Sequence, residues 1–536
     1  MTVLEEVQRR RTFAIISHPD AGKTTLTEKL LLYGGAIHLA GSVRARRNQQ
    51  QTASDWMELE RKRGISITST CLEFPYEGYQ MNLLDTPGHQ DFSEDTYRTL
   101  VAADAAVMLI DSAKGVEPQT LKLFDVCRNR GIPIFTFFNK MDRPGQDPID
   151  LLDELEKVLG IGAFPMNWPL GSGPDFRGVY DRQERQLHVY ERTEHGKKKA
   201  PMHVLEPADP ALTALAGAEN QRKLIEDIEL LDAAGADFDM HAFLRGKVTP
   251  CFFGSAVTNF GVQLFLDRFA KLAPPPEPRP TLAGDYYPVD APFSGFIFKI
   301  QANMDPSHRD RIAFLRVCSG KFERGMQAQH ARLGKSLRLS QAHRLFGQER
   351  VSADEAYPGD IIGLVNPGSF ALGDTLYAGP EVAFEPIPRF APENFAMLRS
   401  KVPSQRDAFL KGINQLLEEG AVQVLYRKAG EVREPILAAV GPLQFEVVQY
   451  RLESEYRVPT ELERLPYAFA RWVRPLGDGK TLKDLKLPLD ARVVADLEGE
   501  PVVLVETKWS RDRLLENNPD FAFSSTSYQM DEAASV

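Results

Sequence analysis

One segment near the amino terminus constrains the fold of this chain more than any other. Residues 17–24, Ser-His-Pro-Asp-Ala-Gly-Lys-Thr, follow an apolar run at 12–17 and open a helical pattern at 23–33. A strand, a Gly-Lys-Thr turn and a helix in this order form the context of a P-loop, whose backbone N–H groups surround phosphate oxygens. The alternative is an N-capped surface turn, which the strand before and the helix after this segment disfavour.

The P-loop supplies the first group of candidate site residues. Lys23 would neutralise the β and γ phosphates, and Thr24 would offer its hydroxyl to Mg²⁺. Ser17 stands where the usual pattern has its first glycine. The residues of this segment that we expect to bind the nucleotide are Ser17, His18, Pro19, Asp20, Ala21, Gly22, Lys23, Thr24 and Thr25.

A second motif stands at the end of a strand expected at 81–85. It consists of Asp85, Thr86, Pro87, Gly88 and His89. Asp85 at a carboxyl strand end can hold Mg²⁺ through water, and Gly88 lets a backbone N–H approach the γ-phosphate. His89 then lies near an attacking water and is our candidate catalytic residue. A lone histidine would more often be structural, but a fixed pentapeptide at a strand end favours the functional interpretation.

A third motif ends the strand expected at 132–139. It consists of Asn139, Lys140, Met141 and Asp142. The Asp142 carboxylate can accept the N1–H and N2–H₂ donors of guanine, whereas adenine would leave this buried carboxylate unpaired. Asn139 can bond the guanine edge, and the Lys140 stem can lie along the base plane. The order of the three motifs therefore predicts GTP or GDP as the ligand.

Two further segments complete the predicted site. Ser255 and Ala256 follow a strand expected at 250–254 and would close the base pocket. Residues 63–68, Arg-Gly-Ile-Ser-Ile-Thr, lie in a polar stretch between the P-loop and Asp85. A nucleotide-sensing switch belongs at this position, and Ser66 could supply a second hydroxyl to Mg²⁺. A solvated charged loop is the alternative for this stretch.

The 536 residues suggest several domains. Residues 1–275 alternate strands and helices, as in a parallel sheet covered on both faces, with a polar insertion at about 160–249. A Pro-rich linker at 276–291 is followed by short strands and turns at 292–388, which predict an antiparallel β-barrel. Residues 389–536 begin with the split βαβ order and end in a tail that we expect to fray after Ser524.

Composition and charge exclude several classes of protein. The formal net charge is 64 − 74 = −10, which argues against a generally basic nucleic-acid coat. The four cysteines form no close pair, so buried reduced thiols are expected. We see no secretory signal and no apolar run of about 18 residues, and we expect a cytoplasmic protein without a membrane span.

Together the nucleotide motifs resemble the guanine-nucleotide domain of a translational GTPase. The His after Asp-Thr-Pro-Gly and the Arg-Gly-Ile-Ser-Ile segment separate the chain from signalling GTPases. Segments outside that domain make the chain similar to bacterial class-II peptide chain release factors. The resemblance covers residues 10–475, and the segments that carry it lie at 55–58, 91–98, 296–322, 418–424 and 440–447.

The resemblance implies a fold, an activity and partners. The fold would be a P-loop GTPase domain, a β-barrel and a ferredoxin-like α+β domain. His89 would orient the hydrolytic water behind an apolar gate of Pro19 and Ile65, and Asp20 would help to balance charge near the phosphates. The implied role is expulsion of class-I release factors from the ribosome, with large-subunit RNA as the activator. We expect a monomer that binds neither DNA nor membranes.

Two alternatives remain open from the sequence. One is a metabolic or ATP-driven P-loop enzyme, which the third motif disfavours. The other is a GTP-gated ribosome factor without a termination role, such as an elongation, rescue or ribosome-protection factor. Arg309, Arg311 and the basic stretch 44–47 are candidates for contact with ribosomal RNA, although solvated surface charge would also explain them.

Overall fold

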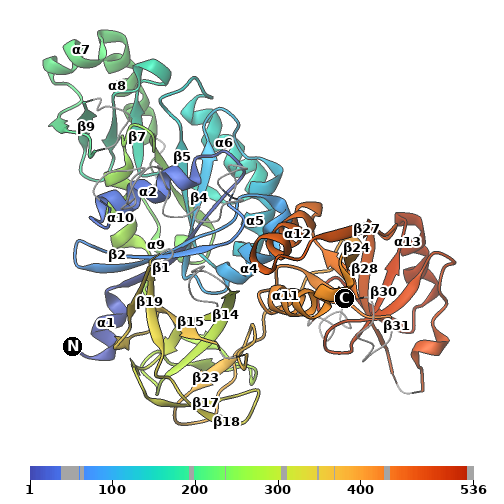
Figure 1. Cartoon of the computed structure of the whole chain (residues 1–536). Coiled ribbons are helices and arrows are strands. Elements are labelled where there is room, and N and C mark those ends of the chain that lie inside the picture. Colours follow the sequence, from blue (N-terminus) through green and yellow to red (C-terminus); the bar gives the residue numbers. More distant parts are fainter. Residues whose placement is uncertain are drawn as a thin grey trace.

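The computed structural model describes residues 1–37, 60, 66–191, 198–233, 235, 237–302, 311–346, 349–366, 368–427, 435–477 and 479–527. Figure 1 shows an α/β region with an upper extension, a β-barrel below it and an α+β unit beside both. None of the described helices is long and apolar enough to cross a membrane.

A seven-stranded sheet forms the centre of the α/β region. Its order is β2-β3-β1-β4-β5-β11-β6, and every pairing is parallel except that of β2 with β3. The strands are β1 (Arg10–Ser17), β2 (Thr70–Tyr76), β3 (Tyr79–Asp85), β4 (Ala105–Asp111), β5 (Ile134–Asn139), β6 (Gly162–Pro165) and β11 (Val248–Phe253). The predicted parallel sheet is confirmed, and β2 is an additional antiparallel edge strand.

Helices cover both faces of this sheet because its strands are apolar on both sides. Along β1, Phe13 and Ile15 pack in one hydrophobic cluster, whereas Ala14 and Ile16 pack in the other. The first cluster includes α2 (Lys23–Tyr33) and α10 (Val262–Leu272), and the second includes α5 (Pro118–Asn129) and α6 (Pro148–Leu159). Two shorter helices are α1 (Val3–Gln8) and α4 (Ser93–Leu100).

The residues expected to form an insertion build the upper extension in Figure 1. A four-stranded antiparallel sheet has the order β10-β9-β8-β7. Its elements and the adjacent helices are β7 (Asn167–Leu170), β8 (Gly178–Asp181), β9 (Gln186–Tyr190), β10 (Met202–Leu205), α7 (Pro210–Ala216) and α8 (Ala218–Ala233). The helix α9 (Met240–Leu244) instead packs on the central sheet, where Phe243 contacts Phe135 of β5. The strand β6 falls in the same stretch of sequence but pairs with β11 in the central sheet.

The Pro-rich stretch and the barrel follow. A short hairpin of β12 (Arg279–Pro280) and β13 (Tyr286–Tyr287) lies in the expected linker. An antiparallel sheet of eight strands then has the order β18-β17-β23-β14-β15-β22-β19-β20. Its strands are β14 (Ser294–Ala302), β15 (Arg311–Ser319), β17 (Gln327–His330), β18 (Lys335–Arg338), β19 (Ala342–Phe346), β20 (Glu349–Ser352), β22 (Ile361–Val365) and β23 (Thr375–Tyr377). A separate pair joins β16 (Phe322–Glu323) to β21 (Glu355–Ala356).

The α+β unit contains two antiparallel sheets packed face to face. The first has the order β25-β26-β24-β27, the arrangement of a split βαβ fold. Its elements are β24 (Asn394–Ser400), α11 (Arg406–Glu418), β25 (Gln423–Leu425), β26 (Ile436–Ala439), α12 (Pro442–Tyr456) and β27 (Thr460–Arg464). Phe395 and Ile436 of this sheet share a core with Trp472 and Leu504 of the second sheet.

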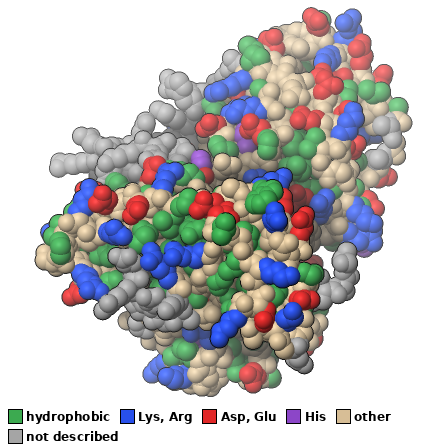
Figure 2. Space-filling model, turned by 90° about the vertical axis from the view of Figure 1, so that its right-hand side faces the viewer, with side chains coloured by type: hydrophobic (Ala, Val, Ile, Leu, Met, Phe, Trp, Pro, Cys, Tyr) green, Lys and Arg blue, Asp and Glu red, His purple; other side chains and the backbone are tan. Residues whose placement is uncertain are grey.

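The second sheet has the order β29-β30-β28-β31. Its elements are β28 (Phe469–Pro475), β29 (Arg492–Ala495), β30 (Pro501–Val505), α13 (Lys508–Asn517) and β31 (Phe521–Ser524). The chain does not fray directly after Ser524, because Ser525 accepts a hydrogen bond from Ala391 and the Ser527 amide donates to Arg389. Figure 2 shows side chains of both signs on the outer face of this unit.

Candidate nucleotide site

The motifs predicted from the sequence meet in a cavity of about 300 Å³. It lies at the carboxyl ends of β1, β3 and β5, where ligands of open α/β sheets bind. The residues that line it are Ser17, His18, Pro19, Asp20, Gly22, Lys23, Thr24, Thr25, Ser66, Gly88, His89, Asn139, Lys140, Arg143 and Val257.

Gly22 is required by the shape of the P-loop. Its φ of 99° is left-handed, and a Cβ at this position would lie 2.4 Å from Nδ2 of Asn139. The same Nδ2 donates a hydrogen bond to the Ala21 carbonyl at 2.8 Å. The strand-to-helix turn is therefore fixed directly by the third motif.

A buried ion pair lies at the start of α2. Nζ of Lys23 is 2.6 Å from Oδ1 of Asp85 and 3.4 Å from Oγ of Ser66. Thr24 and Ser66 thus bring two hydroxyls to the cavity, and the Asp85 carboxylate lies behind its wall against Lys23. Together they are a set of oxygen donors that suits Mg²⁺. No group of three or more His, Cys, Asp or Glu among the described residues could hold a metal. A magnesium ion here would therefore depend on phosphate oxygens as well.

His89 stands at the mouth of the same cavity. It caps the 3₁₀ turn η1 (Gln90–Phe92), and its Nδ1 accepts a hydrogen bond from the Asp91 amide at 3.2 Å. The side chain is 32% exposed and lines the cavity. Because Nδ1 is an acceptor, the neutral ring carries its proton on Nε2. This tautomer can donate a hydrogen bond from Nε2 to a water molecule.

Some residues of the third motif belong to the proposed base pocket, and others hold the surrounding structure in place. Oγ of Ser255 donates to Oδ1 of Asp142 at 2.6 Å, so the pocket-closing serine holds the proposed base-recognising carboxylate. The Ala256 amide donates to Oδ1 of Asn139 at 2.9 Å. Met141 is 2% exposed and belongs to the hydrophobic core.

The remaining predicted residues support the cavity without lining it. Thr86 donates its hydroxyl to the Ile15 carbonyl at 2.7 Å, which joins the ends of β3 and β1. The predicted residues outside the lining are Ala21, Asp85, Thr86, Pro87, Met141, Asp142, Ser255 and Ala256.

Comparisons with known proteins agree with this geometry. Residues 8–275 match the family described as Elongation factor Tu GTP binding domain, 292–379 match Elongation factor G domain 2, and 384–514 match Class II release factor RF3, C-terminal domain. "Peptide chain release factor 3" of Gloeobacter violaceus is 59% identical over 97% of this chain and 98% of its own length. The protein of the same name from Synechococcus elongatus is 57% identical over 98% of this chain and 94% of its own length.

The chain belongs to the peptide chain release factor 3 family. It is therefore a GTPase of translation termination that acts with class-I release factors, and it binds guanine nucleotides. A solved structure from Thermus thermophilus has a TM-score of 0.68 at 24% identity, over 88% of this chain and 71% of the other, and shows the same fold. The predictions of family, fold class and GTPase activity are confirmed.

Sequence reasoning missed several residues of this release factor's site. Nζ of Lys140 lies 2.7 Å from Oδ2 of Asp111, which ends β4 beside the P-loop. Burial opposes ionisation of Asp111, but the hydrogen bonds from Lys140 and from the Ala113 amide outweigh it and lower the pKa. The placement of Asp111 at the end of a buried strand was the available signal. Arg143 and Val257 carry no such signal.

His18 has a structural role that its motif did not predict. The ring is buried, and Nδ1 lies 2.7 Å from the Pro19 carbonyl and 2.5 Å from Oε2 of Glu117. Burial lowers the pKa of His18 more than the nearby Glu117 carboxylate raises it. A neutral His18 that donates from Nδ1 fits this environment.

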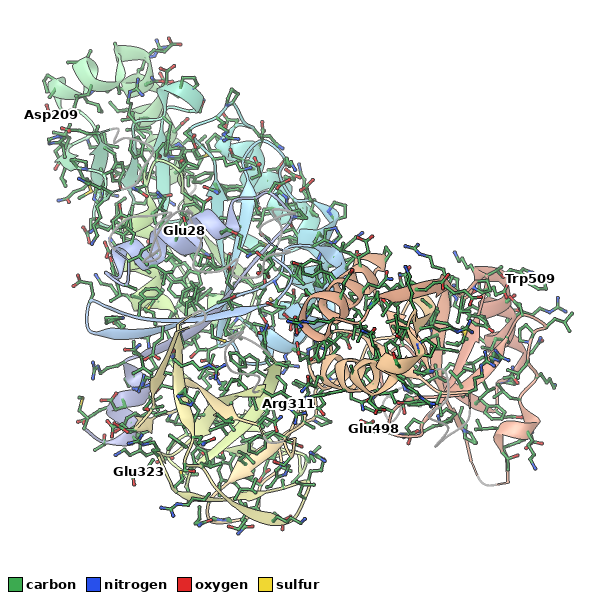
Figure 3. All side chains as sticks on the ribbon, in the orientation of Figure 1. Glu28, Asp209, Arg311, Glu323, Glu498 and Trp509 are labelled. Atoms are coloured by element: carbon green, nitrogen blue, oxygen red, sulfur yellow. The ribbon has the colours of Figure 1, made fainter. Side chains whose placement is uncertain are left out.

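Other predicted positions either lie outside the described residues or lie away from the nucleotide cavity. Ile65 of the proposed gate, Arg309 and the stretch 44–47 lie outside the described residues. Arg311 lies where the barrel meets the α+β unit and pairs with Glu418 (Figure 3). This ion pair gives Arg311 a role within the protein rather than that of a free surface charge.

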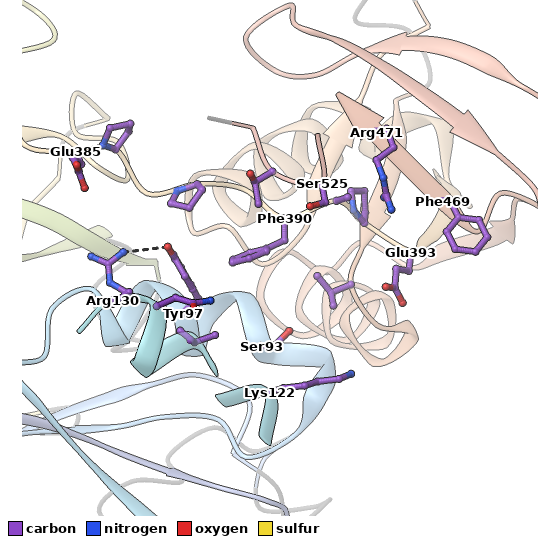
Figure 4. Close-up of a pocket in the computed structure, with 18 of the residues that line it drawn as sticks. Ser93, Tyr97, Lys122, Arg130, Glu385, Phe390, Glu393, Phe469, Arg471 and Ser525 are labelled. Carbon is purple, nitrogen blue, oxygen red and sulfur yellow. Dashed lines mark hydrogen bonds between the residues drawn. The ribbon is translucent and has the colours of Figure 1, made fainter. Parts of the chain in front are cut away.

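A larger cleft lies away from the nucleotide. It measures about 1140 Å³ and is lined by residues of α4 and α5, of the segment 385–393 and of the second sheet of the α+β unit, with the rings of Tyr97 and Phe390 in edge-to-face contact at its wall. Figure 4 shows Tyr97 and Lys122 on one side and Arg471 and Phe469 on the other. The α+β unit thus touches the GTPase region along only part of the surface between them.

Proposed function

We propose that this chain binds GTP with Mg²⁺, engages the ribosome in the cytoplasm after peptide release, and promotes dissociation of the class-I release factor. The proposal includes large-subunit ribosomal RNA as the activator of hydrolysis and a monomeric factor that needs no DNA or membrane. The matches to release-factor relatives over nearly the whole chain support it.

The proposed catalytic step depends on the position of His89. Its ring lines the cavity together with Lys23 and Ser66, and its Nδ1 is held by the Asp91 amide. The Nε2–H would then orient the attacking water toward the γ-phosphate, rather than accept a proton from it. This placement of His89 is the single observation on which the proposed mechanism depends.

The other groups bind and position the nucleotide. Lys23 would exchange Asp85 for the phosphates, while Thr24, Ser66 and Asp85 would hold the magnesium ion directly or through water. Bound Mg²⁺ supplies charge neutralisation at the β and γ phosphates. Asp142, held by Ser255, would select guanine.

The proposed switch is supported by contacts of Ser69, three residues after Ser66. The Ser69 amide and hydroxyl both donate to Oδ2 of Asp95 at 2.8 Å. Nζ of Lys299, in strand β14 of the barrel, donates to the Ser69 carbonyl. A change at Ser66 on hydrolysis would therefore reach the barrel through a direct, buried connection.

The decisive experiment measures release of a labelled class-I release factor from post-termination ribosomes. We expect this protein with GTP to accelerate release, and GDP to leave the rate near its uncatalysed value. The variant His89→Ala should bind GTP normally and lose most ribosome-stimulated hydrolysis. An unchanged release rate with GTP would reject the termination role, and full hydrolysis by His89→Ala would reject the catalytic assignment.

A further inference from the structure

The amino terminus of α12 contacts the segment that follows His89. The Leu443 amide, at the second residue of α12, donates to Oδ2 of Asp91 at 2.7 Å. The Asp91 side chain is 5% exposed, and its backbone amide is the donor that holds Nδ1 of His89. Asp91 therefore connects the α+β unit to the imidazole by two consecutive hydrogen bonds.

Gly441 makes room for this contact. A Cβ on Gly441 would lie 2.0 Å from Cγ of Asp91 and 2.4 Å from its Oδ1. The backbone of Gly441 has φ −133° and ψ 157°, which any residue adopts. The glycine is therefore needed for the close approach of Asp91 and not for the local backbone.

Asp91 also supplies the side-chain oxygen that caps the amino terminus of α12. The residue that precedes the first turn of α12 is Gly441, which has no side-chain oxygen to cap the helix. The Asp91 carboxylate takes that place from a position 352 residues away and lies at the positive end of the helix. The carboxylate therefore stabilises the helix terminus, and the helix terminus stabilises the negative charge of the carboxylate.

The same helix packs against the proposed switch. Val447 of α12 forms a buried cluster with Ile67, the residue after Ser66, and with Phe92 of the turn η1. Leu443 packs at the edge of this cluster. Both loops that flank the γ-phosphate position, at 66–69 and 88–92, thus end against one helix of the α+β unit.

The contact lies at the edge of the junction between the two units. Beside it lies the cleft of about 1140 Å³ that divides α5 from the second sheet (Figure 4). The described polar contacts near the junction include Gln423 to Glu94 and Arg98 to the Gly420 carbonyl, each 3.2 Å. A displacement of the α+β unit that withdraws Leu443 and Gly441 from Asp91 would also open the small buried cluster of Ile67, Phe92 and Val447.

We propose that Asp91 is a positioning residue through which the amino terminus of α12 holds His89 in its hydrolytic orientation. The position of the α+β unit against the GTPase region then sets the rate of GTP hydrolysis. The inference rests on the catalytic role proposed for His89. It adds that residues of another structural unit, Gly441 and the Leu443 amide, control that role.

The test uses Gly441→Ala in the full-length protein, because this residue touches neither nucleotide nor phosphate. Single-turnover GTP hydrolysis is measured against ribosome concentration, and GDP affinity is measured with a fluorescent analogue. We expect kcat to fall about 10- to 100-fold, as for a misplaced catalytic group, with the ribosome KM and the GDP affinity unchanged. Glu453→Ala, an exposed position on the same helix, is the matched control and should behave as the parent protein.

The His89→Ala background separates this inference from the proposed function. If Gly441 acts through His89, adding Gly441→Ala to His89→Ala lowers the rate no further. An equal fold-loss in both backgrounds, or normal hydrolysis by Gly441→Ala, overturns the inference while the role of His89 stands. Full hydrolysis by His89→Ala alone instead rejects the proposed function.

Variants of Asp91 supply an independent measurement. Asp91→Asn keeps an oxygen that can accept from the Leu443 amide, whereas Asp91→Ala removes it. We expect Asp91→Ala to lose about as much kcat as Gly441→Ala and Asp91→Asn to recover most of it. Equal loss in the two Asp91 variants, with thermal unfolding unchanged, would contradict the positioning contact.

Discussion

The ammonium of Lys23 lies 2.6 Å from the carboxylate of Asp85, and both side chains are buried. One is the proposed phosphate ligand and the other the proposed magnesium ligand. Each therefore balances the charge of the other until GTP and Mg²⁺ supply their own charges. Nucleotide and metal should accordingly bind together. When Lys23 turns to the phosphates, Asp85 loses its positive partner, and a magnesium ion replaces that charge.

Replacing Lys23 by Met should weaken GDP binding about 10- to 100-fold, because hydrogen bonds to charged groups contribute about 1.5–3 kcal/mol. The variant also leaves Asp85 without its ammonium partner, so the magnesium dependence of the residual binding should become steeper. Isothermal titration at several Mg²⁺ concentrations measures both effects. Lys122→Met, at an exposed position of α5, should bind normally. Normal GDP affinity in Lys23→Met would contradict the phosphate role.

Asp142→Asn should change which base the site accepts. The Asn carbonyl can still accept from Ser255, which is 2.6 Å from Oδ1 in the parent protein, but its NH₂ now faces the base. Guanine then meets a donor where it needs an acceptor, whereas xanthine presents a carbonyl there. We expect GTP affinity to fall about 10- to 100-fold and xanthosine triphosphate to compete better than in the parent protein. Retained preference for GTP in competition binding would reject the base-recognition role.

The nucleotide motifs could be predicted because each is a short, contiguous segment at the end of a buried strand. Parallel strands bring their carboxyl ends to one edge, so Asp85 and Asn139 had to lie near the P-loop. The split βαβ order could also be predicted, since the hydrophobic patterns typical of strands and helices follow one another in that order at 394–464. The strand β2 was missed, because Pro75 near its end weakened the strand signal.

Contacts between distant parts of the chain could not be predicted. Nothing near Gly441 indicates that Asp91 fills the space of its absent Cβ. Likewise, nothing in the sequence indicates that the amide of Asn139, which is expected to bond guanine, also joins Ala21 to Ala256. Such double use of a polar side chain depends on packing across the fold and leaves no periodic pattern in the sequence.

Asp360→Ala should destabilise the docking of the barrel on the GTPase region. Nε of the buried Arg10 donates to Oδ1 of Asp360 at 2.7 Å, so the variant leaves a buried guanidinium without this partner. Because Glu6 still pairs with Arg10, we expect a loss of about 1–3 kcal/mol in the free energy of unfolding, measured by denaturant titration. Asp354→Ala removes the exposed pair with Arg324 and should change stability by less than about 1 kcal/mol. Equal effects of the two substitutions would show that burial of the Arg10 pair does not matter.

Glu94→Gln should stabilise the protein at neutral pH. Burial raises the pKa of Glu94, although Arg98 and the hydrogen bond from Gln423 oppose the shift. Between the ordinary pKa and the raised one, the folded state binds more protons than the unfolded state, so stability falls as pH rises through this window. The neutral amide keeps an acceptor for Gln423 and removes this fall, while Arg98 retains Asp95 at 3.5 Å. Thermal midpoints of the Glu94→Gln variant are measured from pH 4.5 to 8. They should lie above those of the parent protein at the alkaline end of this range and equal them at the acidic end. Exposed Glu219→Gln is the control, and a parallel displacement of the curve at every pH would exclude the titration of Glu94 as the cause.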